Sequence, residues 1–311
     1  MRLQAMMYLD AVARTGSVRK GAAQLGVASS SISRQISELE RELGVLLFDR
    51  ISGRIRLTGA GEMFLNYARQ TLREFDKVQA RIADLSSPNH GTVTIAATSG
   101  LAGSFIPAVS LQFSQRFQNA RIAAVIRAGS DVVDDVIAGD VDIGLGYKLP
   151  RNPGLHVMEV FAVRHGAVVG RHHPLTRKTT VRLSECAEFP IISPDPRSPL
   201  YEVIQTAFAR ARTTYRSQAQ TNSADFVKYT VMESDGVAFL SLPDVIEEVQ
   251  DGQLVFIPLE ERDTMTQNLV LVQRANAVLG QTASLYAEML RTALRDLTRI
   301  QPARRPQSDS E

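Results

Sequence analysis

The segment from Ser29 to Gly44 carries side chains that could bind a nucleic acid. Its apolar residues recur at spacings of four, three and four, as in an amphipathic helix: Ile32, Ile36, Leu39 and Leu43. On a helix of about 100° per residue, Ser30 and Arg34 point away from this stripe and Ser33 lies on its flank. Short hydroxyls let a DNA backbone approach closely, and an Arg can hold guanine or phosphate with two hydrogen bonds. This pattern predicts DNA contacts; a Ser-rich face exposed to solvent is the alternative.

A short basic hairpin is predicted directly after this helix, in residues 45–57. A Ser-Gly pair separates two alternating apolar segments, as in a hairpin turn, and Arg50 and Arg54 flank it. An Arg in such a wing can reach the DNA backbone or the minor groove. An ion pair of Arg50 with Asp49 or Glu42 is the alternative for that residue.

Two further helices must position this segment. Residues 3–14 and 18–25 carry helical apolar spacing, and Gly26 ends the second helix before a short turn. Two short helices, a turn with Gly and a third amphipathic helix form the pattern of a helix-turn-helix. We expect Ser30, Ser33 and Arg34 to contact bases in the groove. We expect Ser29 and the wing residue Arg54 to contact phosphates. The predicted DNA-binding residues are Ser29, Ser30, Ser33, Arg34, Arg50 and Arg54.

A long helix is predicted from Thr58 to about Leu85. Its apolar residues from Phe64 onward follow a spacing close to 3.5, which is the period of a coiled coil. A helix of this length cannot pack along its whole length on a domain of 58 residues, so we expect it to pair with a second copy. The alternative is a helix that lies on the following domain. Residues 86–91 have the composition of a linker.

From Gly91 onward, predicted strands alternate with predicted helices, which favours parallel α/β layers. The pattern occurs twice, as in two lobes with a cleft between them. Ligands of open α/β sheets bind beyond the carboxyl ends of the strands, near the starts of helices. We predict that strand ends and turns of both lobes bind a small effector: Ser99, Gly100, Ser130, Gly146, Tyr147, Ser193, Arg197 and Asn222. The alternatives are ordinary helix caps and, for Arg197, an exposed loop position.

Composition and charge bound the class of protein. The chain has 311 residues, 44% hydrophobic and 22% charged, which is ordinary for soluble proteins and excludes a disordered or collagen-like chain. Residues 1–58 hold nine Lys or Arg and five Asp or Glu, whereas residues 91–311 hold 22 and 24, so positive charge gathers where DNA contacts are predicted. With no long apolar run and no signal-peptide pattern, we expect a cytoplasmic protein without a membrane span.

The residues offer little to an enzyme, which is the main alternative class. Cys186 is the only cysteine, fits a reducing compartment, and has no partner residue of a catalytic signature. His165, His172 and His173 do not have the spacing of a zinc site. Phosphate-loop and nucleophile-elbow motifs are absent from the sequence, so we expect no catalytic residues, no metal and no cofactor. A DNA-bending protein without an effector is a third possibility, which the two-lobed second half disfavours.

Residues 16–61 resemble the LysR-type transcriptional regulators. Matching positions include Ala22-Ala23, Ser33-Arg34-Gln35-Ile36, Leu39-Glu40, Leu43-Gly44, Leu47-Phe48, Leu57-Thr58 and Gly61. Three positions depart from the family: Ser29-Ser30 replaces a common Gln-Pro, Val18 a common Phe, and Gly21 a common Ala. The first departure should change which bases are contacted, and the last weakens its helix by up to ~1 kcal/mol.

The resemblance implies a fold, an assembly and a mechanism. The fold would be a winged helix-turn-helix (1–58), a dimerising linker helix and hinge (59–90) and a periplasmic-binding-protein-like effector domain (91–300), before a disordered tail (301–311). Its first subdomain would be 91–161 with 268–300 and its second 162–267, with crossings near 161–164 and 264–267. The implied partners are double-stranded DNA with an interrupted dyad operator, a small organic anion such as a carboxylate, further copies in a homodimer or homotetramer, and RNA polymerase.

Overall fold

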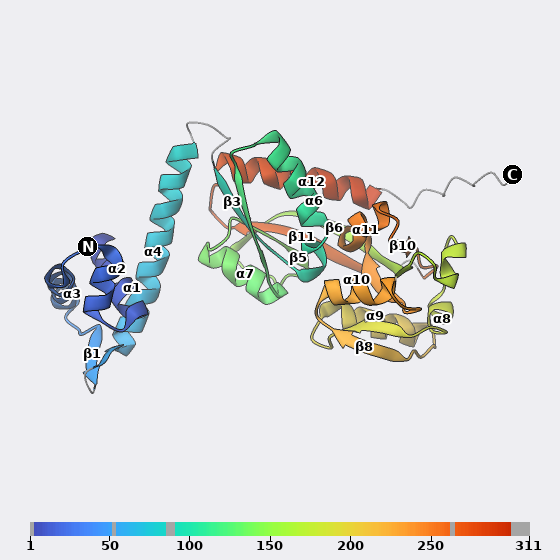
Figure 1. Cartoon of the computed structure of the whole chain (residues 1–311), viewed down its shortest axis with the longest axis horizontal. Coiled ribbons are helices and arrows are strands. Elements are labelled where there is room, and N and C mark those ends of the chain that lie inside the picture. Colours follow the sequence, from blue (N-terminus) through green and yellow to red (C-terminus); the bar gives the residue numbers. More distant parts are fainter. Residues whose placement is uncertain (1–2, 52–53, 85–90, 262–264, 300–311) are drawn as a thin grey trace. The chain divides into compact units, whose positions relative to one another are not determined.

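The computed structural model describes residues 3–51, 54–84, 91–261 and 265–299 (Figure 1), with the backbone alone at 50, 51, 54, 76, 77 and 80–84. The chain forms two compact units, residues 1–82 and 83–311. The predicted hairpin turn at Ser52 and Gly53, most of the predicted linker and the C-terminal tail lie outside the described residues.

Three helices form the predicted helix-turn-helix: α1 (Leu3–Thr15), α2 (Val18–Leu25) and α3 (Ser29–Leu43). The Ser17 hydroxyl accepts a hydrogen bond from the Lys20 amide, which caps the start of α2 as predicted. On α3, Ile32, Ile36 and Leu39 are buried against α1 and its neighbours. Burial of this apolar stripe fixes the rotation of α3 and leaves its opposite side exposed.

The predicted wing is present as the strands β1 (Phe48–Ile51) and β2 (Arg54–Leu57), which pair in antiparallel fashion. The Glu40 carboxylate accepts hydrogen bonds from the backbone amides of Leu47 and Phe48, at 2.8 and 3.2 Å. One side chain near the end of α3 therefore fixes the point at which the hairpin leaves the helix.

Helix α4 (Gly59–Asp84) begins where predicted, and all of it up to residue 82 belongs to the first unit. Thr58 accepts a hydrogen bond from the Gly61 amide and donates one to the Leu46 carbonyl. The Arg69 guanidinium lies 2.7 Å from the Asp10 carboxylate of α1. Leu65 and Ala68 are buried in the core with α1 and α3. Residue 58 as a domain boundary stays a prediction, since helix α4 shares this core.

In the second unit, a first lobe is built on three parallel strands: β3 (Thr92–Ala97), β4 (Arg121–Ile126) and β5 (Ile143–Tyr147). The short helix α5 (Ser99–Ala102) follows β3. One face of the sheet packs on α6 (Phe105–Arg116) and α12 (Gln281–Arg299), and the other on α7 (Gly129–Ala138) (Figure 1). These parallel α/β layers are confirmed.

Two long antiparallel strands connect the lobes: β6 (Leu155–Gly170) and β11 (Thr266–Arg274). The first part of β6 pairs with β11, and its last part pairs with β9 and β10 of the second lobe. Strands β6 and β11 therefore add antiparallel pairs to the predicted parallel strands, and the sheet is mixed. The strand at 155–170 was not predicted, because a chain that passes from one lobe to the other lacks a regular alternation of buried and exposed residues.

The second lobe contains the elements η1 (Pro174–Arg177), α8 (Leu183–Cys186), β7 (Ile191–Pro194), α9 (Pro199–Arg210), β8 (Ser217–Thr221), α10 (Ala224–Met232), β9 (Ala238–Ser241), α11 (Leu242–Gln250) and β10 (Leu254–Ile257). Strands β7 and β8 are parallel, whereas β9 and β10 both run antiparallel to β6. The predicted alternation of strands and helices is confirmed here, and β6 joins the sheets of both lobes.

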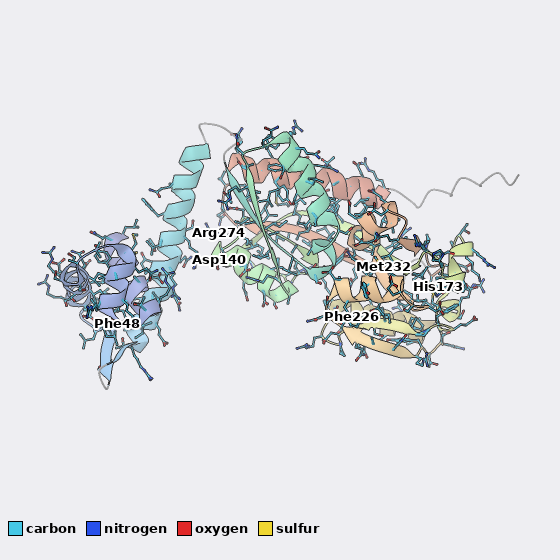
Figure 2. All side chains as sticks on the ribbon, viewed as in Figure 1. Phe48, Asp140, His173, Phe226, Met232 and Arg274 are labelled. Carbon is cyan, nitrogen blue, oxygen red and sulfur yellow. The ribbon has the colours of Figure 1, made fainter. Side chains whose placement is uncertain are left out.

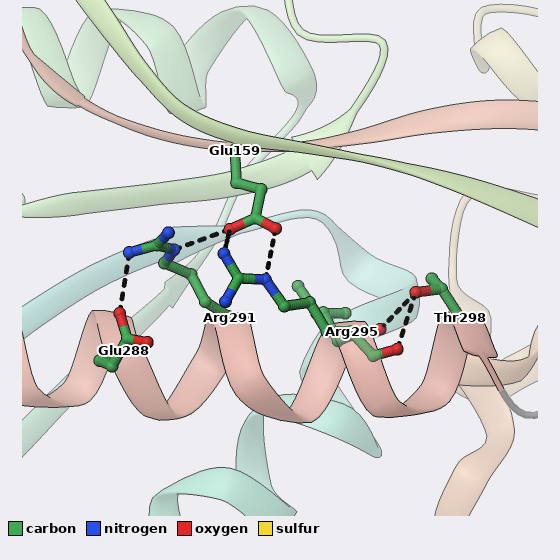
Figure 3. A network of polar contacts seen from close by, with 6 residues as sticks. Glu159, Glu288, Arg291, Arg295 and Thr298 are labelled. Atoms are coloured by element: carbon green, nitrogen blue, oxygen red, sulfur yellow. Dashed lines mark hydrogen bonds and ion pairs between the residues drawn. The ribbon is translucent and has the colours of Figure 1, made fainter.

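An ion-pair network fixes α12 to the connecting strand β6 (Figure 3). Glu159 accepts hydrogen bonds from Arg295 and Arg291, at 2.7 Å each, and Arg291 also contacts Glu288. The hydrogen bond from Arg295, followed by that from Arg291, lowers the pKa of the Glu159 carboxyl. The first half of β6 is thereby held within the first lobe.

His173 lies in the second lobe (Figure 2). It is buried, and both of its ring nitrogens form hydrogen bonds. Nδ1 lies 3.1 Å from the Leu175 amide and accepts its proton, and Nε2 lies 3.2 Å from the Asp235 carbonyl oxygen. This pattern requires a neutral ring with its proton on Nε2. Burial lowers the pKa of His173, with a smaller opposing effect of the Asp235 carbonyl bond.

We predict that Gly61→Ala destabilises the first unit by about 1–3 kcal/mol through steric conflict. A Cβ atom at Gly61 would lie 2.0 Å from the Leu47 carbonyl oxygen, whereas one at Gly59 would contact nothing within 4 Å. Gly59→Ala in the same helix is the matched control and should leave the melting temperature unchanged or higher. Calorimetric melting of both variants measures this, and equal melting temperatures would contradict the contact.

We predict that the protein loses stability as the pH falls from 7.5 toward 5.5. Because the pKa of His173 is lowered in the fold from 6.5, the unfolded chain binds a proton first, and stabilisation present above pH 6.5 is lost on acidification. Urea unfolding at several pH values should show a smaller loss for His173→Gln than for the wild type. Exposed His156, replaced by Gln, is the control and should leave the slope unchanged.

Candidate DNA-binding face and effector site

The outer side of α3 carries the predicted groove contacts. Ser29, Ser30 and Ser33 are exposed, and 73% of the Arg34 side chain is accessible. The Arg34 Nε atom lies 4.0 Å from the Glu38 carboxylate, a loose contact that leaves the guanidinium able to turn to another acceptor. The predicted orientation of these side chains is confirmed, and their contact with DNA stays a prediction.

The start of α3 adds backbone donors to this face. Ala28 is the N-cap residue and has no side chain able to accept a hydrogen bond from the first turn. The Ser31 amide donates to the Ala28 carbonyl at 3.0 Å, so the first two amides of the helix are the ones left for an outside acceptor, and the helix dipole favours an anion there. Such a helix start is suited to a DNA phosphate beside Ser29.

The side chains of Arg50 and Arg54 lie outside the part of the chain whose side chains are described. Their backbones are placed in the hairpin, where Arg50 pairs with Ile55 and Arg54 with Ile51. The predicted contacts of these two Arg with phosphate or the minor groove stay predictions, as does the alternative pairing of Arg50.

Five predicted effector residues come from the first lobe. Ser99 and Gly100 open α5 directly after β3, and Gly146 and Tyr147 end the neighbouring strand β5, which pairs with β3. The structure therefore brings these four residues to one edge of the sheet. Ser130 lies in the first turn of α7 and is exposed, with its hydroxyl 3.3 Å from the Asp131 carboxylate.

Three predicted effector residues come from the second lobe and differ in exposure. Ser193 on β7 is fully buried, and Asn222 after β8 is exposed. Arg197 is 86% exposed, and its guanidinium donates to both oxygens of Asp195 at 2.9 and 3.1 Å. The Arg197 bonds hold the pKa of Asp195 at about 2. Arg197 is thus exposed and paired within its own loop. Its contact with an effector stays a prediction.

The lobes meet through hydrogen bonds from these same strand ends. The Ser99 hydroxyl accepts from the Ala224 amide at 3.2 Å, and the Ser104 hydroxyl accepts from the Glu247 amide at 2.9 Å. Ser99 therefore binds the start of α10 in the other lobe and not the helix that it begins. We call this contact region, where α5 and the end of β5 face α10 and α11, the lobe junction.

Asp244 is a junction residue that the sequence analysis missed. Only 2% of it is exposed, and its carboxylate accepts hydrogen bonds from the Ser241 amide and hydroxyl at 3.0 and 2.6 Å. The Tyr147 hydroxyl of the other lobe donates to it at 2.9 Å. Burial, followed by the Asp244 charge, raises the pKa of Tyr147 well above its usual value. A Ser-x-x-Asp spacing signals a helix start, but the cross-lobe partner has no sequence signal.

Two buried hydroxyls near the strand ends lack a hydrogen-bond partner within the described structure: Thr98 Oγ1 after β3, and Ser193 Oγ on β7. Buried polar groups are rarely left without a partner, because each forfeits its bonds to water. One hydroxyl comes from each lobe, next to residues already predicted to bind an effector. Each hydroxyl could still donate one hydrogen bond and accept another.

The described residues contain no arrangement typical of enzymes. Cys186 is fully buried, and burial raises the pKa of its thiol to about 12, so it is not a reactive thiolate. His165 and His173 are buried separately, His172 accepts from Arg171, and no cluster of the described residues could hold a metal ion. No described helix is long and apolar enough to cross a membrane.

The chain is similar to several transcriptional regulators along most of its length. It is 26% identical over 292 residues to a probable RuBisCO transcriptional regulator of Trichormus variabilis, with 92% of this chain and 86% of the relative covered. It is 27% identical over 276 residues to a probable nitrogen assimilation transcriptional activator of Synechococcus elongatus, with 88% of each covered.

Solved structures of low sequence identity share the fold. Full-length CbnR in complex with its target DNA matches with a TM-score of 0.66 and 21% identity, covering 94% of this chain and 100% of that chain. Full-length OxyR from Pseudomonas aeruginosa matches with a TM-score of 0.64 and 16% identity, covering 95% of each.

Two family models account for both units of the chain. The model of the bacterial regulatory helix-turn-helix protein of the lysR family matches residues 3–62, and that of the LysR substrate binding domain matches residues 86–295. The two models together place a DNA-binding domain before an effector-binding domain, as in regulators and not in enzymes. The chain therefore belongs to the LysR family of transcriptional regulators.

Proposed function

We propose that this regulator binds an interrupted dyad in promoter DNA through the outer side of α3 and responds to a small organic anion bound between its lobes. The observation that carries DNA binding is the side of α3 opposite its buried stripe, which exposes short hydroxyls and the Arg34 guanidinium, whose contact with Glu38 is long, at 4.0 Å. Ser30, Ser33 and Arg34 enter the major groove, and Ser29, with the wing residues Arg50 and Arg54, contacts phosphates. A protein that acts on promoter DNA in this way works in the cytoplasm, which is the proposed location.

We propose a homodimer through α4, which exposes apolar side chains along its length: Met63 at 77%, Tyr67 at 49%, Phe75 at 41% and Val78 at 48%. Apolar residues at this spacing favour the pairing of two helices. A dimer carries two copies of α3, which suits two half-sites separated by a whole number of DNA turns. We further propose that two such dimers form a tetramer. In this proposal the regulator controls the promoter through contact with RNA polymerase.

The proposed effector is a small molecule with a carboxylate or similar anionic group. Support comes from the partnerless hydroxyls of Thr98 and Ser193 and from the strand-end residues Ser99, Gly100 and Tyr147. Helix starts at α7 and α10 add a positive potential beside Ser130 and Asn222. The alternative function, DNA bending without an effector, does not require a second unit of two lobes that contact each other at the ends of their strands. The presence of such a unit therefore favours an effector-binding regulator.

We predict that Arg34→Ala removes about 1–3 kcal/mol of discrimination between the operator and scrambled DNA. The arginine would lose its two bonds to one base pair, so operator affinity should fall more than non-specific affinity. Arg41→Ala is the matched control, because it removes the same charge about 10 Å farther along the helix. Titrations of both variants on both DNAs at two salt concentrations measure this. An equal loss on both DNAs would reduce Arg34 to a phosphate contact.

We predict that Ser193→Ala leaves the ligand-free melting temperature unchanged or raises it, since the buried hydroxyl has no partner to lose. The same change should abolish most of the thermal shift produced by an active member of a panel of small mono- and dicarboxylates. Ser110→Ala is the opposite control: its hydroxyl bonds Tyr286 at 2.7 Å, so stability should fall while the ligand response remains. A full ligand response in Ser193→Ala would exclude this hydroxyl from the effector site.

A further inference from the structure

The carboxylate of Asp244 is surrounded by groups that a free anion would use. Its Oδ2 accepts from the amide and the hydroxyl of Ser241, and its Oδ1 accepts from the Tyr147 hydroxyl. Within the described structure, no Lys or Arg forms an ion pair with this carboxylate, although it is 2% exposed. A buried carboxylate without a cation depends on such hydrogen bonds to offset its lost hydration.

The surroundings of Asp244 come from both lobes. Tyr147 ends β5 in the first lobe, whereas Ser241 and Asp244 lie at the start of α11 in the second. Gly100, at the start of α5, leaves the room: a Cβ atom there would lie 2.2 Å from Asp244 Oδ1. The lobe junction therefore contains one anion-binding position, and a side chain of the protein fills it.

We propose that Asp244 is an internal ligand of the lobe junction. Its carboxylate fills an anion-binding position, holds the lobes together through Tyr147, and competes with the acid group of the effector. This inference rests on the proposed effector function. It assigns the effector a structural effect in addition to binding. The incoming carboxylate replaces Asp244 as the acceptor of the Tyr147 hydrogen bond, and the loss of that bond separates the two lobes at this point.

The competition also explains why an effector would need further contacts. A group tethered to the site acts at an effective concentration in the millimolar range, so a bare carboxylate at micromolar concentration does not displace it. An effector that also bonds the free hydroxyls of Thr98 and Ser193 gains the additional affinity. A ligand that displaces Asp244 is therefore a carboxylate with a second polar group.

A purely local function of Asp244 is the competing explanation. Ser241 and Asp244 form a capping box at the start of α11, in which each binds the backbone of the other. The Tyr147 hydroxyl also lies 2.6 Å from the Ser241 hydroxyl, but neither of the two side-chain-to-backbone bonds of the cap involves Tyr147. Tyr147→Phe therefore removes the contacts of this hydroxyl with the other lobe and leaves the two backbone bonds of the cap in place, which makes the two explanations separable.

The first experiment is rescue of Asp244→Ala by formate, followed by thermal melting. The variant should melt several degrees below the wild type, and formate should recover part of this loss in a saturable way, whereas chloride at equal ionic strength should not. The wild type should not respond, because its site is filled. Adding Tyr147→Phe to Asp244→Ala should raise the half-saturating formate concentration about tenfold, because a hydrogen bond to a charged group is lost.

The second experiment measures the lobe distance and does not depend on how well Asp244→Ala folds. Lys148 and Glu202 lie on opposite lobes, both exposed, with Nζ and Oε2 3.1 Å apart, so spin labels at K148C and E202C report on the junction. Native Cys186 is buried and stays unlabelled. Asp244→Asn and Tyr147→Phe should each lengthen and broaden the distance distribution.

Asp142→Asn is the matched control for the distance measurement. Its carboxylate accepts from the Thr94 amide and hydroxyl inside the first lobe, so its loss should leave the lobe distance unchanged. If Asp244→Asn and Tyr147→Phe also leave it unchanged, or if formate acts equally on the wild type and Asp244→Ala, Asp244 only caps α11 and the proposal is overturned. Neither experiment uses DNA or an effector, so failure of the proposed function in DNA titrations would be recognised separately.

Discussion

The pairing of β6 with β11 is the constraint on which the second half of the molecule depends. Strand β6 runs through both lobes and β11 pairs with its first part, so the register of this ladder helps decide which groups of the two lobes meet. The pairing of β11 with β5 sets Leu269 beside Tyr147, and the pairing of the last part of β6 with β9 sets His165 beside Ser241. The polar contacts of the lobe junction follow from these two registers, since the side chains face one another only in this alignment.

The DNA-binding half is held together in a different way. A few hydrogen bonds and one ion pair fix the positions at which the hairpin and α4 begin relative to the helices. Glu40 holds the first residues of the hairpin, Thr58 joins the start of α4 to the same loop, and Asp10 binds Arg69 across two helices. A helix that presents side chains to DNA must keep its rotation within narrow limits. The bond near the end of α3 and those between its neighbours provide that rigidity at positions away from the exposed face.

Close approach of backbone to side chain explains two glycines that the helical pattern alone would not favour. Gly61 faces the Leu47 carbonyl, and Gly100 faces the Asp244 carboxylate of the other lobe. In both cases the methyl group of an alanine would overlap an oxygen atom that already accepts a hydrogen bond. Gly61 lets α4 approach the residue before the wing, and Gly100 lets the two lobes approach each other. Each glycine is therefore explained by a close tertiary contact and not by the conformation of a turn.

The sequence by itself determined the local elements and their faces. The spacing of Ile32, Ile36 and Leu39 was enough to orient α3, because a helix has one fixed period and its apolar side must be buried. The family also followed from the sequence, since its helix-turn-helix residues lie close together along the chain. Only the tertiary structure decided that β6 spans both lobes, and that Tyr147 meets Asp244, nearly a hundred residues away. Contacts of this kind depend on strand register and lobe packing, which no local pattern encodes.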